Sequence, residues 1–412
     1  MAILKIIVVG AGPSGLLLAL LLANAGINVQ VLEAASKLDE SPRATHYSWP
    51  ALYELKRAGI LEEVRERGFV TWGGIQWRNL EGTLLARFNP DAILKDNRLH
   101  CLPLGKLCNL MKEHLDRRPN AEVKYMHRVS KIDQTEACAR VWAQTPHGEQ
   151  TFEADYVVGC DGASSQIRQA LFGDDFPGRT WDEQIVATNV YYNIERHGWD
   201  QGAFIVDPVY WSMALQISLD GMLRVTYGEV PGLTREEYLT RQPEKFRTIL
   251  PGHPSPEDYK IVNFSPYKIH QRCAKSFRVG RFLLAADAAH LCNPFGGLGL
   301  TGGIVDVGNL FDCLNGIHQG LADENILDRY NQVRREKYFE FIDPVSSANL
   351  RRLIQDPEVA MKEDSFFKMA KDFEDAEFCA RLGLGVNAIM HDFTQEYRKA
   401  GEALPENLQS KT

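Results

Sequence analysis

The sequence has no long apolar run, no paired-cysteine motif and no excess of positive charge, and each absence argues against a class of protein. No segment approaches about eighteen consecutive apolar residues, so none is a candidate for a membrane-spanning helix. The eight cysteines are scattered, form no CxxC pair and lie beside no histidine at zinc spacing. This pattern favours reduced, mostly buried thiols over a disulfide framework or a zinc site, and we expect a cytoplasmic protein.

The charge balance and the length narrow the class further. The formal net charge is -8, whereas nucleic-acid binding needs a basic surface, so we expect no nucleic-acid partner. Hydrophobic residues make up 44% and charged residues 24% of the chain, as in ordinary soluble globular proteins. A chain of 412 residues exceeds what a single core usually holds, so we expect two or three structural units.

One short apolar run, Leu16 to Ala23, lies near the N-terminus and has the composition of a signal-peptide core. Gly10, Gly12 and Pro13 interrupt the segment before it, and the run is too short to span a bilayer. We therefore expect a buried helix at this place.

This helix belongs to a strand-turn-helix-strand unit. Residues 4–9 form a β-branched apolar run that predicts a buried strand, residues 14–25 predict a helix, and residues 28–32 predict a second strand. The turn reads Gly10-Ala11-Gly12-Pro13-Ser14-Gly15, and a GxGxxG pattern in this context is typical of a dinucleotide site. The first glycine makes the tight turn, the second lets the backbone approach a pyrophosphate, and the third lets helix and strand pack closely.

Glu33 ends the second strand, where an acidic residue accepts hydrogen bonds from the adenosine ribose. A 2′-phosphate would meet like charge there, so we expect the tightly bound nucleotide not to be NADP. The helix N-terminus offers free N–H groups and a positive dipole end to the phosphates. This motif alone does not distinguish FAD from NAD.

A second glycine-rich segment in the last third of the chain favours FAD. Residues 282–286 predict a buried strand that ends before Asp287, and five glycines follow among residues 296–303. Glycines let the main chain lie close to a flat ring. A helix that begins at about Gly302 would direct its positive end at the negative charge of a reduced flavin. Asp287 would accept a hydrogen bond from a sugar-alcohol hydroxyl such as ribityl.

With these motifs the sequence resembles the FAD-dependent aromatic hydroxylases, the para-hydroxybenzoate hydroxylase family of single-component flavoprotein monooxygenases. Residues 10–15 with Glu33, residues 161–168 and residues 287–303 carry the resemblance, in order and at family spacing, over about residues 1–340. Arg43 falls where the family has a flavin-loop arginine. The chain differs in having Ala286 in place of the glycine of the family's Gly-Asp pair.

The resemblance implies non-covalent FAD, with NADPH or NADH as a transient co-substrate. Dioxygen would form a flavin C4a-hydroperoxide, which passes one oxygen atom to a small electron-rich substrate, either aromatic or a secondary metabolite. We assign no catalytic residue and no metal ligand. The residues expected at the cofactor are Gly10, Gly12, Pro13, Ser14, Gly15, Glu33, Arg43, Asp161, Asp287, Pro294, Gly297, Gly299 and Leu300.

The fold expected from this resemblance is α/β, a discontinuous Rossmann-like FAD-binding domain with an inserted β-rich substrate domain and a helical C-terminal part. The expected FAD-binding domain comprises residues 1–70, 101–180 and 271–325. The substrate domain comprises 71–100 and 181–270, and the C-terminal segment comprises 326–412. We expect a monomer or a homodimer.

Several functional assignments stay open at this stage. Residues on the expected substrate sheet that either contact substrate or belong to the core are Tyr192, Tyr210, Trp211, Met213 and Arg224. His46, Tyr47 and His290 either border the flavin or pack, and Arg168 either has a functional role or pairs with Asp161. The rival functions are a reductase or dehydrogenase of the same fold that transfers no oxygen, and a non-catalytic FAD-binding protein.

Overall fold

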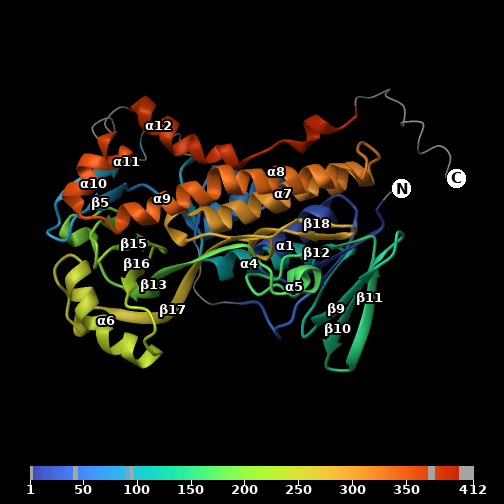
Figure 1. Ribbon diagram of the computed structural model, residues 1–412, viewed down its shortest axis with the longest axis horizontal. Helices are drawn as coiled ribbons and strands as arrows, with labels where there is room; N and C mark the ends of the chain where they lie inside the picture. Colours follow the sequence, from blue (N-terminus) through green and yellow to red (C-terminus); the bar gives the residue numbers. More distant parts are fainter. Residues whose placement is uncertain (1–2, 40–44, 90, 92–96, 370–375, 399–412) are drawn as a thin grey trace.

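The computed structural model describes residues 3–39, 45–89, 91, 97–369 and 376–398. A six-stranded sheet forms the part of the molecule near the N-terminus (Figure 1). Its strands, in spatial order, are β18 (Arg278–Val279), β19 (Phe282–Leu284), β12 (Tyr156–Gly159), β1 (Lys5–Val9), β2 (Asn28–Leu32) and β8 (Ala121–Lys124). All neighbours are parallel except β18 and β19, which places the carboxyl ends of β1, β2, β12 and β19 at one edge.

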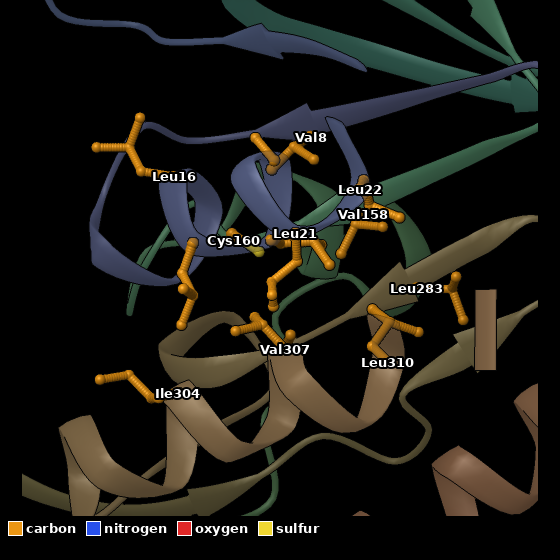
Figure 2. Packing of buried hydrophobic residues seen from close by; sticks show 14 of the residues in the cluster. Val8, Leu16, Leu21, Leu22, Val158, Cys160, Leu283, Ile304, Val307 and Leu310 are labelled. Carbon is orange, nitrogen blue, oxygen red and sulfur yellow. The ribbon is translucent and has the colours of Figure 1, made fainter. Parts of the chain in front are cut away.

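Helix α1 (Pro13–Asn24) is buried on every side, because it lies between this sheet and helix α7 (Leu298–His318). Ten of its twelve residues are buried. Figure 2 shows side chains of α1, among them Leu21, meeting Val307 of α7 and Val158 of the sheet. The signal-peptide-like run is therefore the core helix that we expected. In the described part of the chain, no helix has both the length and the apolar character needed to cross a membrane.

An eight-stranded sheet forms the other large layer. Its strands, in spatial order, are β20 (His290–Leu291), β17 (Lys260–Cys273), β13 (Gly178–Tyr191), β16 (Met222–Glu229), β15 (Ser212–Gln216), β14 (Gly202–Ile205), β5 (Ile75–Arg78) and β6 (Leu84–Phe88). Neighbours are antiparallel except β14 and β5. Helix α6 (Arg235–Ile249) covers one face through Tyr238, Phe246 and Ile249, which leaves the opposite face directed at the glycine-rich segment.

Smaller elements complete the two layers. Two three-stranded sheets are formed by β3 (His46–Tyr47), β7 (His100–Cys101) and β4 (Phe69–Val70), and by β9 (Arg128–Gln134), β10 (Ala139–Thr145) and β11 (Gly148–Ala154). Further helices are α2 (Trp49–Arg57), α3 (Leu61–Arg67), α4 (Leu104–Leu115) and α5 (Gln166–Phe172). Short helical turns are η3 (Glu195–His197), η4 (Pro256–Asp258), η5 (Ala286–Ala288) and η6 (Pro294–Gly296).

The C-terminal part is helical. It comprises α8 (Ile326–Lys337), the π-helical turn η7 (Tyr338–Ile342), α9 (Asp343–Leu353), α10 (Pro357–Glu363), α11 (Ser365–Lys368), α12 (Ala376–Leu384), η9 (Gly385–Ile389) and η10 (Phe393–Glu396). Helix α8 lies alongside α7, while α10 and α11 lie near β5 (Figure 1). The expected fold class, α/β with a helical C-terminal part, is thus confirmed.

Two expected boundaries are wrong. Helix α7 begins at Leu298, not near Gly302, because Gly297, with a left-handed φ of 62°, ends the preceding turn η6 and the helix starts at the next residue. Strand β19 ends at Leu284, and Ala286 has a positive φ of 57° that no strand residue adopts.

Candidate functional site

The three glycines of the first turn have different surroundings. A Cβ added to Gly10, whose φ is +102°, would lie 2.5 Å from the Cys160 carbonyl oxygen. A Cβ on Gly15 would lie 2.0 Å from the Gly10 carbonyl oxygen, whereas a Cβ on Gly12 would meet nothing within 4 Å. Gly10 and Gly15 are therefore required by packing, and Gly12 faces space that a ligand can occupy.

The turn is held in place by Glu33. Its carboxylate accepts hydrogen bonds from the backbone N–H groups of Ala11 and Ala35, both at 2.7 Å. Pro13 is the first residue of α1, and the helix has no side-chain cap, so its first N–H groups are available to an anion. Glu33 remains partly exposed, which leaves its oxygens accessible to a hydroxyl group.

The second glycine segment has a similar open end. Gly297 caps α7 without a side-chain cap, and a Cβ there would meet nothing within 4 Å. Buried Asn293 fixes the turn that contains Pro294, because its side chain accepts from the Phe295 N–H at 3.1 Å. Gly299 and Leu300 lie in the first turn of α7, partly exposed. Both glycine segments thus present backbone and open space, as a dinucleotide requires.

The two segments meet at Ser14. A Cβ on Gly303 of α7 would lie 2.6 Å from the Ala286 Cβ and 3.3 Å from the Ser14 hydroxyl oxygen. The start of α1, the turn that carries exposed Asp287 and the first half of α7 are therefore adjacent. Residues that lie far apart in the sequence form one surface at the carboxyl edge of the sheet, where ligands of such folds bind.

Asp161 acts as a helix cap. Its carboxylate accepts from the Ser165 hydroxyl at 2.5 Å and from the Gln166 N–H at 2.7 Å, at the start of α5. Burial raises the pKa of Asp161, and the hydrogen bond from Ser165 opposes that shift. Arg168 donates to the carbonyl oxygens of Ala163 and Ala288, so it fastens α5 to the turn after Asp287.

Asp306, which no sequence motif marks, holds the turn that carries Asp287. Its carboxylate accepts from the Ala286 N–H at 3.0 Å and from Arg334 Nε at 2.7 Å, and lies 2.7 Å from His290 Nε2. Burial alone would raise the pKa of Asp306, but His290 and Arg334 outweigh burial and lower it to about 2. A buried aspartate inside a largely apolar helix is the signal that could have revealed this network.

Burial sets the pKa values of three side chains beside the glycine segment and the eight-stranded sheet. Tyr267 is 40% exposed, yet burial raises the pKa of its phenol while Arg224 opposes that shift. Burial also raises the pKa of Cys292 to about 12 and lowers the pKa of His46 to about 4, although both are partly exposed.

The glycine segment packs on the face of the eight-stranded sheet opposite α6. Cys292 precedes the glycines, Tyr267 belongs to β17 and His46 to β3. Trp211 packs edge-on against Phe295 of the glycine segment, with ring centroids 5.3 Å apart. This contact joins the glycine segment directly to the sheet.

The structure separates the other candidate residues. Trp211 and Met213 lie in the core cluster that includes Phe295, whereas Tyr192 and Tyr210 pack on the α6 side of the sheet. Tyr47 is buried and donates to the Leu102 carbonyl oxygen. Arg43 lies outside the described residues. In those residues no group of three or more histidine, cysteine or acidic side chains is placed to hold a metal ion.

Comparison with known proteins identifies the ligand that this arrangement fits. The model of the FAD binding domain family matches residues 4–343. The para-nitrophenol 4-monooxygenase of Pseudomonas sp. (strain WBC-3) is 40% identical over 369 residues, which cover 89% of this chain and 91% of the relative. The 6-hydroxy-3-succinoylpyridine 3-monooxygenase of Pseudomonas putida is 38% identical over 352 residues, 85% of this chain and 88% of the relative.

Solved structures agree with these matches. The crystal structure of p-nitrophenol 4-monooxygenase from Pseudomonas putida has a TM-score of 0.89 at 36% identity and covers 94% of this chain and 99% of that chain. A flavin-dependent monooxygenase in complex with FAD and substrate shares the fold, with a TM-score of 0.75 at 20% identity, and covers 94% of this chain and 72% of that chain. The chain belongs to the FAD binding domain family and is a flavoprotein monooxygenase of the FAD-dependent aromatic hydroxylase type.

Proposed function

We propose that this monooxygenase uses NADPH or NADH to place one oxygen atom from O2 on the ring of a small phenol. The observation that carries the proposal is the match to para-nitrophenol 4-monooxygenase, which extends over nine-tenths of both chains at 40% identity. The junction between the glycine segment and the sheet supports it, since ligand sites favour such junctions between layers. The rival functions, a reductase and a non-catalytic FAD protein, have no comparable match among these relatives.

Bound FAD would accept a hydride from the nicotinamide and activate O2 for transfer of one oxygen atom. The overall reaction consumes NAD(P)H, O2 and a proton, releases water and NAD(P)+, and leaves the second oxygen atom in the product. The protein itself would bind the cofactor and the substrate, orient them toward each other and exclude water. Trp211 and Phe295 form an apolar wall beside the glycine segment, which would keep bulk water away from the reacting ring.

We propose the following cofactor contacts. Gly12 and the first turn of α1 would hold the pyrophosphate, and Glu33 would hold the adenosine ribose. Gly297, Gly299 and Leu300 would lie against the flavin ring, and Asp287 would accept from the ribityl chain. Further proposed contacts are Gly10, Pro13, Ser14, Gly15, Arg43, Asp161 and Pro294. The division into units at residues 70, 100, 180, 270 and 325 is also part of this proposal.

The test is an isotope experiment on the FAD-loaded enzyme. A panel of para-substituted phenols, 4-nitrophenol included, is incubated with NADPH or NADH under oxygen-18 gas. We expect substrate-dependent oxidation of the nicotinamide and a product that carries one oxygen-18 atom. Nicotinamide oxidation without labelled product would contradict the proposal and favour the reductase. If neither NADPH nor NADH reduces the flavin, a non-catalytic FAD protein would be favoured.

A further inference from the structure

We propose that Gln271 of β17 is a positioning residue for the cofactor, and that together with Ser346 of α9 it sets the direction in which the open end of α7 faces the flavin. The inference rests on the proposed cofactor contacts, because these place the glycine segment against the flavin ring. Gln271 acts through Asn293 and does not itself contact the cofactor.

The Gln271 side chain is buried between the sheet and the glycine segment. It is 1% exposed and lies on the same face of β17 as Ile269, which packs in the core cluster of Phe295. Its Oε1 atom accepts a hydrogen bond from the Asn293 backbone N–H at 2.9 Å. Asn293 in turn accepts from the Phe295 N–H. The turn η6 therefore takes its position from β17.

The orientation of the Gln271 amide follows from these contacts. A backbone N–H can only donate, so the group of Gln271 that faces Asn293 is the carbonyl oxygen. The amide nitrogen points the other way and donates to the Ser346 hydroxyl oxygen at 2.6 Å. The Ser346 hydroxyl donates to the Ile342 carbonyl oxygen, also at 2.6 Å. All three bonds run in one direction, from the turn to the start of α9, and bonds in such a chain strengthen one another.

Helix α9 also contacts the turn directly. Asn349 Nδ2 donates to the Phe295 carbonyl oxygen at 3.3 Å, and a Cβ added to Gly296 would lie 3.3 Å from the Ser346 Cα. The turn is thus held by β17 on one side and by α9 on the other, and Gln271 connects the two.

The pairing of backbone groups changes at Gly297. The N–H groups of Asn293, Phe295 and Gly297 bond to protein oxygens. Helix α7 begins at the next residue, Leu298, without a side-chain cap, so its first N–H groups are open to a ligand. The contacts of Gln271 therefore end where the proposed flavin contacts begin.

The direction of these open N–H groups affects both binding and reduction of the flavin. The N-terminal end of a helix stabilises a nearby negative charge, and the effect falls off within the first turn. Without Gln271, the N–H of fully buried Asn293 has no partner, and a buried donor left unpaired is costly. The turn then moves, and the start of α7 moves with it.

The experiment measures FAD affinity and flavin potential in four proteins: the unmodified chain, Gln271→Met, Ser346→Ala and Gln242→Met. Rebinding of FAD to the stripped proteins, followed by flavin fluorescence, gives the dissociation constant. Equilibration of the FAD-loaded proteins with a reference dye gives the midpoint potential. NAD(P)H and substrate are left out, so neither measurement depends on turnover.

Gln271→Met keeps the length of the side chain and removes its amide. We expect the dissociation constant for FAD to rise at least about tenfold. The midpoint potential should become more negative, because the reduced, negatively charged flavin loses part of its stabilisation. Ser346→Ala leaves the bond between Gln271 and Asn293 in place, so it should change both quantities in the same direction but less. It also tests the inference if Gln271→Met does not fold.

Gln242→Met is the matched control. Gln242 belongs to α6, is 4% exposed and donates to the Tyr259 hydroxyl oxygen at 3.1 Å, on the opposite face of the sheet. The same exchange there should lower the stability to urea, as in Gln271→Met, but leave FAD affinity and midpoint potential unchanged. This comparison separates a positioning role from a general loss of stability.

Two results would overturn the inference: an unchanged FAD affinity and potential in both Gln271→Met and Ser346→Ala, or equal changes in Gln242→Met. If labelled product still forms in the oxygen-18 experiment, the proposed function stands while this inference fails. If the variants behave as expected but no phenol gains oxygen, the inference stands and the proposed function fails.

Discussion

A single alanine shows how closely this site is packed. Ala286 occupies the left-handed region at φ 57°, where a side chain costs about 1–2 kcal/mol. Its Cβ lies where a Cβ on Gly303 would come within 2.6 Å. The methyl group of Ala286 is thus matched by a glycine in the facing helix.

This pair predicts coupled effects on the free energy of unfolding. Ala286→Gly should change stability by less than about 1 kcal/mol, because relief of strain is offset by greater entropy of the unfolded chain. Gly303→Ala should destabilise the protein by about 1–3 kcal/mol through overpacking. In the double variant that cost should shrink by about 0.5 kcal/mol or more. Urea unfolding of all four proteins measures the coupling, and strictly additive effects would contradict the contact.

The sequence predicted best those elements whose structure depends on residues that are neighbours in the chain. Residues 10–15 lie on a strand, a turn and a helix that are contiguous in sequence, so periodicity and glycine spacing were sufficient to predict them. The start of α7 was misjudged because Gly297 and Gly302 have the same composition signal, and only the backbone angle of Gly297 shows which one caps the helix.

Contacts between distant elements could not be predicted in this way. Alternation along β16 placed Arg224 on a face but did not tell which face meets the flavin side. The pairing of Asp306 with Arg334 joins two helices and depends on how these pack, which no local pattern encodes.

Helices α2 and α7 meet at a buried carboxyl group, and burial there disfavours its charged form. Glu54 is 2% exposed, and a Cβ on Gly308 of α7 would lie 2.1 Å from its carboxyl carbon. Burial, reinforced by Asp312, raises the pKa of Glu54 to about 7, although Arg57 at 2.9 Å opposes the shift. The carboxyl group is therefore protonated in the folded protein over a range in which the unfolded chain ionises.

The free energy of unfolding should therefore decrease as the pH rises. The part that neutral Glu54 contributes is fully present below its unfolded pKa of about 4.3 and is lost as the pH rises through about 7. Each pKa unit corresponds to about 1.4 kcal/mol, so the loss should reach about 3 kcal/mol. Denaturant unfolding of Glu54→Gln between pH 5 and pH 8 should lack this decline. Glu62→Gln, on the exposed surface of α3, is the control and should retain it.

At the scale of the whole molecule, Asp306 connects parts that lie far apart in the sequence. Through the Ala286 N–H it holds the turn that carries Asp287, and through His290 it reaches β20, the edge strand of the eight-stranded sheet. Through Arg334, which also donates to the Ile389 carbonyl oxygen, it joins α8 and the C-terminal segment. The proposed cofactor surface and the C-terminal part are therefore fastened to the same buried carboxylate.

Asp306→Asn should destabilise all of these parts together. Removing one partner of a buried ion pair leaves an uncompensated charge on Arg334 and costs about 3–5 kcal/mol. The pKa of Asp306 in the folded protein, about 2, lies below its unfolded value. The contribution of Asp306 to stability is therefore present above about pH 4 and is lost as the pH falls through about 2. Urea unfolding at pH 7 should show the full cost, with weaker FAD binding because the Ala286 turn is released.

The control is Asp328→Asn, which removes an exposed carboxylate of α8 that pairs with Arg278. This change should cost less than about 1 kcal/mol and leave FAD binding unchanged. Equal costs for the two variants would contradict a central role for Asp306.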